Sequence, residues 1–313
     1  MHALIAIAML AADIRVDVLG SPLGAPTASG TFANRNQLAG YLNLCFAAGL
    51  GLLIGGWTAA PFRRSWRQRM RDGLVLLLGD ATRIRLLLIL IVIGLILSRS
   101  RMGNASFVIG MLFATACHAA WTRGSRKIVL IVVASIVLVD LGLIGAWVGI
   151  DRVVARVAST PLTVHGATPV AGGEESVADR LGPGLDAWQI VREHPFFGTG
   201  GGTFELAFRS LSPRPQGYYL HAANDYLEIA SEVGLVGLLA LIMLAVVAVV
   251  RSLVILRTGN DSRTRAAAVA SLMGVVCCGL HGWVDFNLQA PLIALMMSVI
   301  VALPFAVRPP APA

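Results

Sequence analysis

The 313-residue chain is 56% hydrophobic, and only 13% of its residues are charged. That charged share is about half of the share in a typical soluble domain, so the chain could not cover a folded core with a water-facing surface. The composition therefore excludes a soluble enzyme or a soluble binding domain. We expect lipid to surround most of the molecule.

Apolar runs near the length that crosses a bilayer follow one another along the chain. A spanning helix needs about 20 mainly apolar residues, because the bilayer core offers no water to the backbone. Seven runs meet this description, at 36–56, 84–98, 104–121, 128–150, 232–250, 266–282 and 288–307. The predicted fold is all-α: a polytopic transmembrane helical bundle of about seven spans with one long outward-facing loop.

The net charge of +8 is distributed unevenly. Loops on one predicted side carry 15 basic residues against three acidic ones, whereas the opposite side carries 10 basic and 13 acidic residues. Because positively charged loops stay in the cytoplasm, the loops around 13–35, 99–103, 151–231 and 283–287 are predicted to face outward. Attraction to anionic lipid explains the cytoplasmic arginines, and the sequence contains no nucleic-acid-binding motif.

One outward loop, from about Asp151 to Ser231, is far longer than the others, and such loops commonly carry function. We treat residues 1–313 as a single membrane domain with 151–231 as a loop within it. Residues 179–193 are predicted to form a short helix on the membrane surface. The glycine run of HPFFGTGGGTF (194–204) lacks the lysine and the preceding strand of a phosphate-binding loop, so we interpret it as a turn at the interface.

Arginines in the outward loops are the first candidate site residues. Arg99 and Arg101 lie in SRSRMG, between two apolar runs, where an arginine either extends to the lipid headgroups or binds an anion. Arg180, in DRLGPG, is a second candidate phosphate contact; the alternative is a solvated arginine paired with a nearby aspartate. A guanidinium binds phosphate through two hydrogen bonds and keeps its charge, so a diphosphate is a suitable ligand.

Two histidines with an acidic residue four positions later are candidates for proton transfer. His221 comes before Asp225 where the long loop re-enters the membrane, and if the helix has begun, Asp225 could orient the imidazole as a general base. His281 and Asp285 repeat this spacing in HGWVDFNLQAP. Both histidines could equally be surface or packing residues. The cysteines and histidines show no metal-ligand spacing, so no metal is expected.

Five segments in this order resemble the O-antigen ligase family, which includes O-antigen and exopolysaccharide polymerases. The segments are GTFANRNQLAGYL (30–42), SRSRMG (98–103), DRL followed by REHPFFGTGGGTF, HAANDYLEIASEVGLVGL (221–238) and HGWVDFNLQAP (281–291). Family members have more helices before the first segment, so the chain is similar to the C-terminal portion of a family protein.

The resemblance implies transfer of a glycan from an undecaprenyl diphosphate carrier to a hydroxyl of an acceptor glycan or glycolipid. The enzyme would be a glycosyltransferase or ligase without metal or other cofactor, with its active side at the periplasmic face of the bacterial inner membrane. Arg101 and Arg180 match the family's loop arginines, with Arg99 beside the first. The predicted catalytic residues are His221, Arg101 and Arg180. The predicted substrate-binding residues are Arg99, Asn224, Asp225, His281 and Asp285.

The chain departs from the family pattern at two positions. An aromatic residue usually follows the second arginine by four, and here that position is Gly184. Members commonly have a histidine directly before the asparagine, whereas Ala223 precedes Asn224 here. Either His221 acts from two positions earlier, or part of the catalytic apparatus is lost. The first alternative requires that residues 221–223 are not yet helical.

A membrane transporter, or a non-catalytic protein that binds lipid-linked glycans, is the alternative function. A transporter is expected to have paired ionisable groups or broken helices near the centre of the bilayer. Within the predicted spans, Asp140 is the residue that meets this description. The pattern therefore favours the enzyme.

Overall fold

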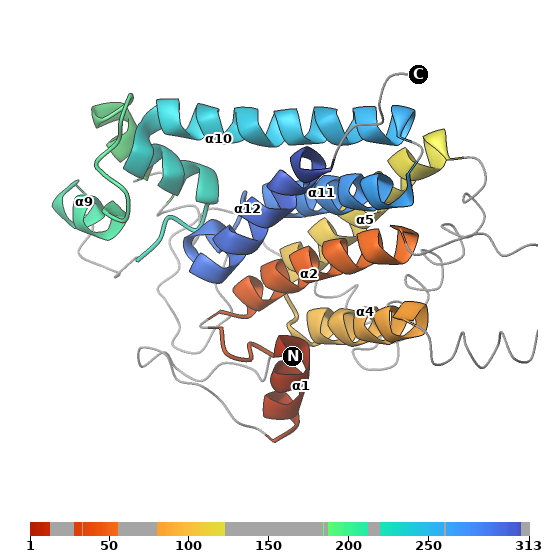
Figure 1. Ribbon diagram of the computed structural model, residues 1–313. Helices are drawn as coiled ribbons and strands as arrows, with labels where there is room; N and C mark the ends of the chain where they lie inside the picture. Colours follow the sequence, from red (N-terminus) through yellow and green to blue (C-terminus); the bar gives the residue numbers. More distant parts are fainter. Residues whose placement is uncertain are drawn as a thin grey trace, which may run out of the picture.

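A computed structural model of the protein describes residues 1–12, 28–32, 34–55, 80–122, 184, 187–211, 220–259 and 261–307. All regular structure in these ranges is helical (Figure 1). The helices are α1 (His2–Ala11), α2 (Arg35–Gly55), α4 (Asp80–Leu97), α5 (Arg101–Trp121), α9 (Phe204–Leu211), α10 (Asp225–Thr258), α11 (Ser262–His281), the 3-10 helix η1 (Asn287–Gln289) and α12 (Pro291–Ala306).

Four described helices, α2, α5, α10 and α11, are long and apolar enough to cross a membrane. They correspond to four of the predicted spans, and α4 and α12 form at two more. The predicted all-α polytopic transmembrane fold is confirmed. The predicted span 128–150, with Asp140 in it, lies outside the described residues.

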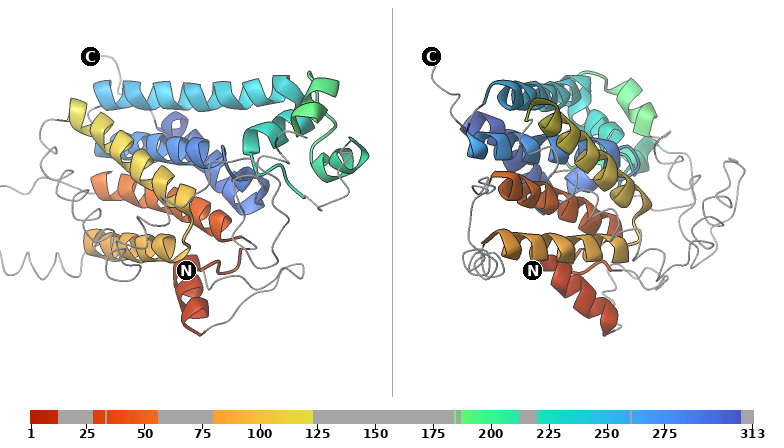
Figure 2. Two further views of the ribbon diagram at one scale, coloured as in Figure 1. Left: turned by 180° about the vertical axis from the view of Figure 1, so that it is seen from behind. Right: turned by 90° about the vertical axis from the view of Figure 1, so that its right-hand side faces the viewer.

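The centre of the bundle is α11, which packs against α2, α5, α10 and α12 (Figure 2). Small residues let these helices approach closely, as is usual where lipid supplies no hydrophobic drive between helices. At Gly51 of α2, an added Cβ would lie 2.5 Å from the carbonyl oxygen of Ala266 in α11. Phe46 and Phe107 fill the space between α2 and α5, with ring centroids 4.7 Å apart.

The outermost helix is α10, and its side chains identify the surroundings of the bundle. Leucine, valine and methionine side chains on several of its sides are exposed, among them Leu235, Val236, Leu239, Leu241, Met243, Leu244, Val246, Val247 and Val250. A helix that is apolar on all sides and exposed suits hydrocarbon, not water.

A break at Gly234 divides α10 into a first part, 225–233, and a long second part, 235–258. Gly234 has φ 72° and ψ 177°, a conformation that helical residues do not adopt. The two parts meet at an angle in Figure 1. The span predicted at 232–250 begins beside this break, while α10 as a whole starts earlier, at Asp225, and continues to Thr258.

The turn Pro195–Gly200 forms hydrogen bonds with the backbone groups of α10 that lose their helical partners at the break. The amides of Leu235 and Val236 donate to the carbonyls of Pro195 and Phe196, at 2.8 and 3.3 Å. The amides of Thr199 and Gly200 donate to the carbonyls of Ser231 and Glu232, at 2.9 and 2.8 Å. We call Pro195–Gly200 the cap turn, because it bonds to the free carbonyls before the break and to the free amides after it.

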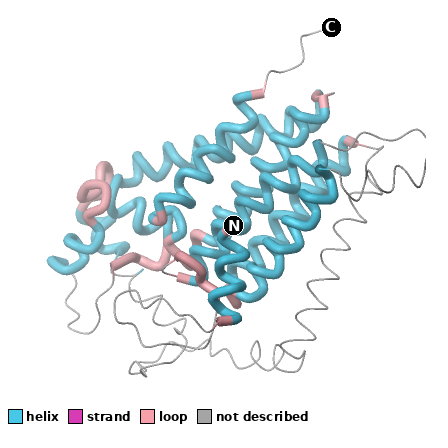
Figure 3. The backbone as a smooth tube through the Cα atoms, turned by 60° about the horizontal axis from the view of Figure 1, so that its bottom comes forward, coloured by secondary structure: helices cyan, strands magenta, loops and turns pink. Residues whose placement is uncertain are grey.

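The helix directions separate two ends of the bundle. α2, α5 and α10 begin at the end where α4 and α11 finish, and we call this the site end (Figure 1). Most of the described loops, pink in Figure 3, lie at one end of the bundle. The opposite end carries most of the described arginines, namely Arg83, Arg85, Arg251, Arg257, Arg263 and Arg265. The acidic residues Asp225, Glu228 and Asp285 lie at the site end.

Candidate functional site

The segment from His221 to Asn224 lies directly before α10 and is not helical. Asn224 is the N-cap of α10, with φ −156° and ψ 111°, and its side-chain oxygen accepts from the Leu227 amide at 3.1 Å. Ala223 has φ 51°, a left-handed conformation that is uncommon for alanine. This backbone turn directs the segment back across the first turn of the helix.

Glu228 is the partner of His221. Its Oε1 lies 2.6 Å from His221 Nδ1, and its Oε2 accepts from the Ala222 amide at 2.8 Å. Glu228 is buried, with 1% of its side chain exposed, whereas 35% of the His221 side chain is exposed. A carboxylate can only accept, so we assign the imidazole hydrogen to Nδ1, which leaves Nε2 as a proton acceptor.

The predicted orientation of His221 by Asp225 is wrong. The helix starts at Asp225, so His221 is outside it and the spacing of four residues does not bring the two together. Glu228, which the sequence analysis did not select, takes this role. Its signal was available in the sequence: an asparagine N-cap at 224 puts Glu228 one turn into the helix, facing the residues that precede the cap.

Asp225 holds the loop between α11 and α12. Its carboxylate accepts from the Leu288 amide at 3.0 and 3.3 Å, and its own amide donates to the carbonyls of Gly282 and Asp285. Only 2% of Asp225 is exposed. It therefore fixes residues 282–288 against the start of α10.

The same loop contacts His221 directly. The Phe286 ring stacks on the His221 ring, with centroids 4.2 Å apart and planes inclined by 15°. The side-chain amide of Asn224 donates to the carbonyl of Trp283 at 2.9 Å. Glu228 and Phe286 thus hold the imidazole from two directions, which restricts its rotation.

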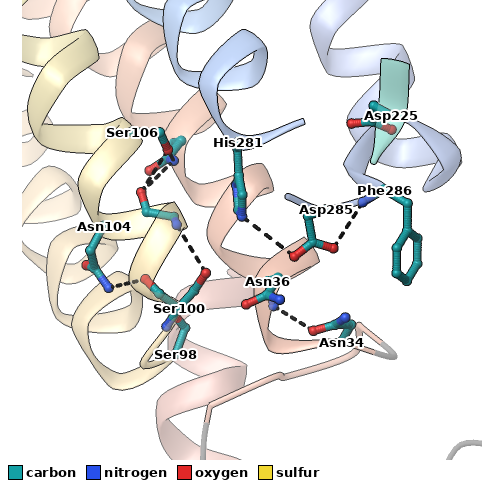
Figure 4. A network of polar contacts seen from close by, with 12 residues as sticks. Asn34, Asn36, Ser98, Ser100, Asn104, Ser106, Asp225, His281, Asp285 and Phe286 are labelled. Atoms are coloured by element: carbon teal, nitrogen blue, oxygen red, sulfur yellow. Dashed lines mark hydrogen bonds and ion pairs between the residues drawn. The ribbon is translucent and has the colours of Figure 1, made fainter. Parts of the chain in front are cut away.

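His281 and Asp285 form a buried pair under this loop (Figure 4). His281 Nε2 lies 3.9 Å from Asp285 Oδ2, and the other carboxylate oxygen of Asp285 accepts from the Phe286 amide at 3.0 Å. The two side chains are 1% and 3% exposed. The pair links the end of α11 to the residue that stacks on His221.

The SRSRMG segment forms a tight turn from α4 into α5. Arg99 has φ 53°, and the Ser100 side chain caps α5 by accepting from the Gly103 amide at 3.1 Å. Arg101 is the first residue of α5, and both arginines are exposed. A helix N-terminus carries partial positive charge, so with two guanidinium groups it favours an anion.

Buried polar contacts attach this turn to the rest of the site end. Asn43 of α2 donates to the Gly103 carbonyl and the Ser106 hydroxyl, at 3.0 and 3.2 Å. Cys277 of α11, one turn before His281, donates to the Ser106 carbonyl at 3.2 Å. The start of α5 and the end of α11 therefore share one end of the bundle with His221, as Figure 4 shows for Ser100, His281 and Asp285. Arg180 lies outside the described residues.

The first part of the glycine run is bonded to α10 and not open to a ligand. The amides of Thr199 and Gly200 are used by the carbonyls of α10, and Glu232 accepts from the Phe204 amide at the start of α9. The predicted turns form, at residues 195–197 and 201–202, and their location at the membrane interface stays a prediction. Among the described residues, no group of three or more histidine, cysteine or acidic side chains could hold a metal ion.

The described part of the chain is that of a polytopic helical membrane protein with a histidine–glutamate pair and two exposed arginines at one end of the bundle. A model of the O-antigen ligase family matches residues 86–242, which is half of the chain. The chain belongs to the O-antigen ligase family. The match includes SRSRMG, the long loop and the first part of α10. No protein of curated function matches the chain.

Proposed function

We propose that this protein transfers a glycan from an undecaprenyl diphosphate carrier to a hydroxyl of an acceptor glycan or glycolipid. The reaction is ligation or polymerisation, at the periplasmic face of the bacterial inner membrane, in the biosynthesis of O-antigen, lipopolysaccharide or exopolysaccharide. Family membership supports glycan transfer in general. The donor, the acceptor and the face of the membrane are parts of our proposal.

The observation that carries the proposal is the His221–Glu228 pair at 2.6 Å. A buried carboxylate that accepts from Nδ1 fixes the imidazole tautomer and stabilises the imidazolium that forms when Nε2 takes a proton. With one third of its side chain exposed, His221 can reach an acceptor hydroxyl while Glu228 stays dry. This arrangement suits a general base.

The reaction also requires groups that bind the leaving diphosphate and stabilise its charge. Arg101, with Arg99 beside it and Arg180 from the long loop, would bind the phosphate oxygens and stabilise the negative charge that develops on them. The start of α5 adds the partial positive charge of a helix N-terminus.

The proposed transfer is a substitution at the anomeric carbon of the donor sugar. His221 Nε2 removes the proton of the acceptor hydroxyl while its oxygen attacks the anomeric carbon of the donor sugar. The bond from that carbon to the diphosphate oxygen breaks, and the electron pair leaves with the diphosphate. The proton then passes from His221 to water or to the released diphosphate.

The four remaining predicted site residues divide by burial. Asn224 is accessible beside His221, and we retain it as a candidate substrate contact. Asp225, His281 and Asp285 are each at most 3% exposed. We propose that these three residues position the loop that carries Phe286, because a buried side chain cannot touch a glycan without movement of the loop.

A deletion strain of the source bacterium, complemented with variants of the full-length protein, tests the proposal. In strains with Arg101→Ala or His221→Ala, we expect loss of the surface glycan on gels and accumulation of the carrier-linked glycan, measured by mass spectrometry. Arg101→Lys should retain part of the activity, because lysine keeps the charge without the paired hydrogen bonds.

The matched control is Arg209→Ala, in an exposed arginine of α9 that pairs with Glu205. This variant should keep wild-type activity. Full transfer by both Arg101→Ala and His221→Ala at normal protein levels would contradict the assignment of the site.

A further inference from the structure

Two large apolar side chains of the cap turn are exposed. Phe196 is 67% exposed and Phe197 is 78% exposed, the latter more than any apolar side chain on α10. Exposed aromatic pairs of this kind need a partner, because apolar area in water is unfavourable. No part of the proposed reaction uses them.

The backbone of the cap turn is held rigidly in place. Four backbone hydrogen bonds join it to both sides of the break in α10, and the Thr199 hydroxyl adds a bond to the Ser231 carbonyl at 3.3 Å. At Gly234 an added Cβ would lie 2.1 Å from the Phe196 carbonyl oxygen, and at Gly198 one would lie 2.4 Å from the Glu232 backbone. Phe196 and Phe197 therefore have a fixed position relative to α10.

That position is the start of the lipid-facing part of α10. Residues 235–258 number 24, and at about 1.5 Å per residue they extend roughly 36 Å. The first 16 of these residues, 235–250, precede Arg251 and extend roughly 24 Å, and the Arg251 side chain can extend several ångströms further to the headgroups. The hydrocarbon core is about 30 Å thick, so with the Arg251 guanidinium at one boundary, Leu235 lies at or near the other. Leu235 and Val236, which bond to the cap turn, are themselves exposed apolar residues of this face.

We infer that the cap turn is a membrane anchor, whose Phe196 and Phe197 side chains insert at the boundary between the headgroups and the acyl chains of the leaflet at the site end. The partner is the bilayer lipid, because the exposed phenylalanines are bonded through the backbone of their turn to Leu235 and Val236, where the lipid-exposed part of α10 begins. Phenylalanine, leucine and tryptophan are the apolar side chains that segments at this level of the membrane bury between headgroups and acyl chains. Since Glu228 precedes the break by six residues, the anchor also fixes the level of the His221–Glu228 pair relative to the membrane.

The test measures the depth of residue 197 in vesicles. The probe is a nitroxide on p-acetylphenylalanine, which replaces phenylalanine with a similar ring and leaves the four native cysteines unlabelled. The full-length protein, Phe197→p-acetylphenylalanine, is reconstituted in vesicles of phosphatidylcholine and phosphatidylglycerol. Collisions of the nitroxide with apolar oxygen and with a polar nickel chelate are then compared by electron paramagnetic resonance.

Two labelled positions provide references in the same protein. Leu239, 61% exposed on α10, reports lipid, and Glu193, exposed at a helix end two residues before the cap turn, reports water. We expect the ratio of oxygen to nickel collisions at 197 to exceed the ratio at 193 several-fold and to approach the ratio at 239. A ratio equal to that at 193 would mean that the turn is in water. Poor access of both reagents would mean that protein covers the turn, and either result would overturn the inference.

Discussion

At the scale of single residues, Glu228 determines what His221 can do. Each oxygen of Glu228 accepts one hydrogen bond, from His221 and from the Ala222 amide. Glutamine has one accepting and one donating end. With its oxygen toward His221, its NH2 group faces the Ala222 amide and two donors meet; with its NH2 group toward His221, the imidazole must carry its hydrogen on Nε2 and can no longer accept a proton there. The proposed base would lose its fixed tautomer and the charge that stabilises its protonated form.

We therefore expect Glu228→Gln to lower kcat at least about 10-fold, and by no more than loss of His221 does, because the wrong tautomer disables the base; KM should change little. His221→Ala should cost about 10²- to 10⁴-fold, the usual contribution of a general base. The double variant should be no slower than His221→Ala, because the two residues act as one unit. Glu193→Gln, in an exposed glutamate that bonds to Gln189, is the control and should be neutral. Additive losses would mean that Glu228 has a role independent of His221.

Ala223 occupies the position at which family members commonly have histidine. The condition under which His221 could act in its place is met, because the helix begins at Asp225 and residues 221–224 are not helical. Histidine is among the residues that tolerate the left-handed conformation of position 223 better than most.

We expect Ala223→His to restore part of the transfer lost in His221→Ala, measured as the initial rate of product formation in membranes. Ala223→Asn tolerates the same backbone conformation without a basic side chain, and it should restore nothing. No rescue by histidine, in a variant that folds as the wild type does, would indicate that the two positions do not reach the same hydroxyl.

At the scale of elements, the break in α10 depends on glycine at two places. Gly198 and Gly234 both have positive φ and touch the backbone of the facing segment. Gly201, in the same glycine run, has open space where its Cβ would be. Within this run, the fold therefore requires glycine at position 198 but not at position 201.

We expect Gly198→Ala and Gly234→Ala each to destabilise the protein by more than about 2 kcal/mol, because the left-handed backbone penalty adds to a backbone clash. The measurement is the midpoint of thermal unfolding in detergent. Gly201→Ala should change stability by less than about 0.5 kcal/mol. Equal midpoints for the three variants would mean that the cap turn is not packed against the break.

At the scale of the whole molecule, the helices could be predicted because lipid requires each span to be helical and apolar. The break at Gly234 could not, since the apolar run continues through it without a proline. Glu228 was missed for a related reason: its role depends on where the helix begins, and helix ends are the least certain part of a sequence-based prediction. SRSRMG could be predicted as a candidate because its loop between two apolar runs is short and carries two arginines. His221 could be predicted from its position where the long loop re-enters the membrane.

The burial of His281 and Asp285 was not predictable from their spacing. The sequence places them between two spans, where exposure to water and burial under a loop are both compatible with a spacing of four residues. His281 and Asp285 are buried because segments far apart in the sequence meet here. Asp225 of α10, for example, accepts a hydrogen bond from the Leu288 amide and so holds the loop in place. Interactions of this kind depend on how helices are arranged, which hydropathy does not specify.

The orientation of the molecule in the membrane is the last prediction, and the arrangement of charges supports it. The arginines of the end opposite the site, among them Arg251, Arg257 and Arg263, would face the cytoplasm. We expect a membrane-impermeant thiol reagent to label cysteines placed at 165, 180, 201 and 216 in intact spheroplasts. Cysteines at 67, 125 and 261 should react only after permeabilisation. The native thiols lie within the apolar helices α2, α5 and α11, so the parent protein should label weakly and serves as the blank. Reaction at 261 but not at 201 in intact spheroplasts would reverse the orientation and move the site to the cytoplasmic face.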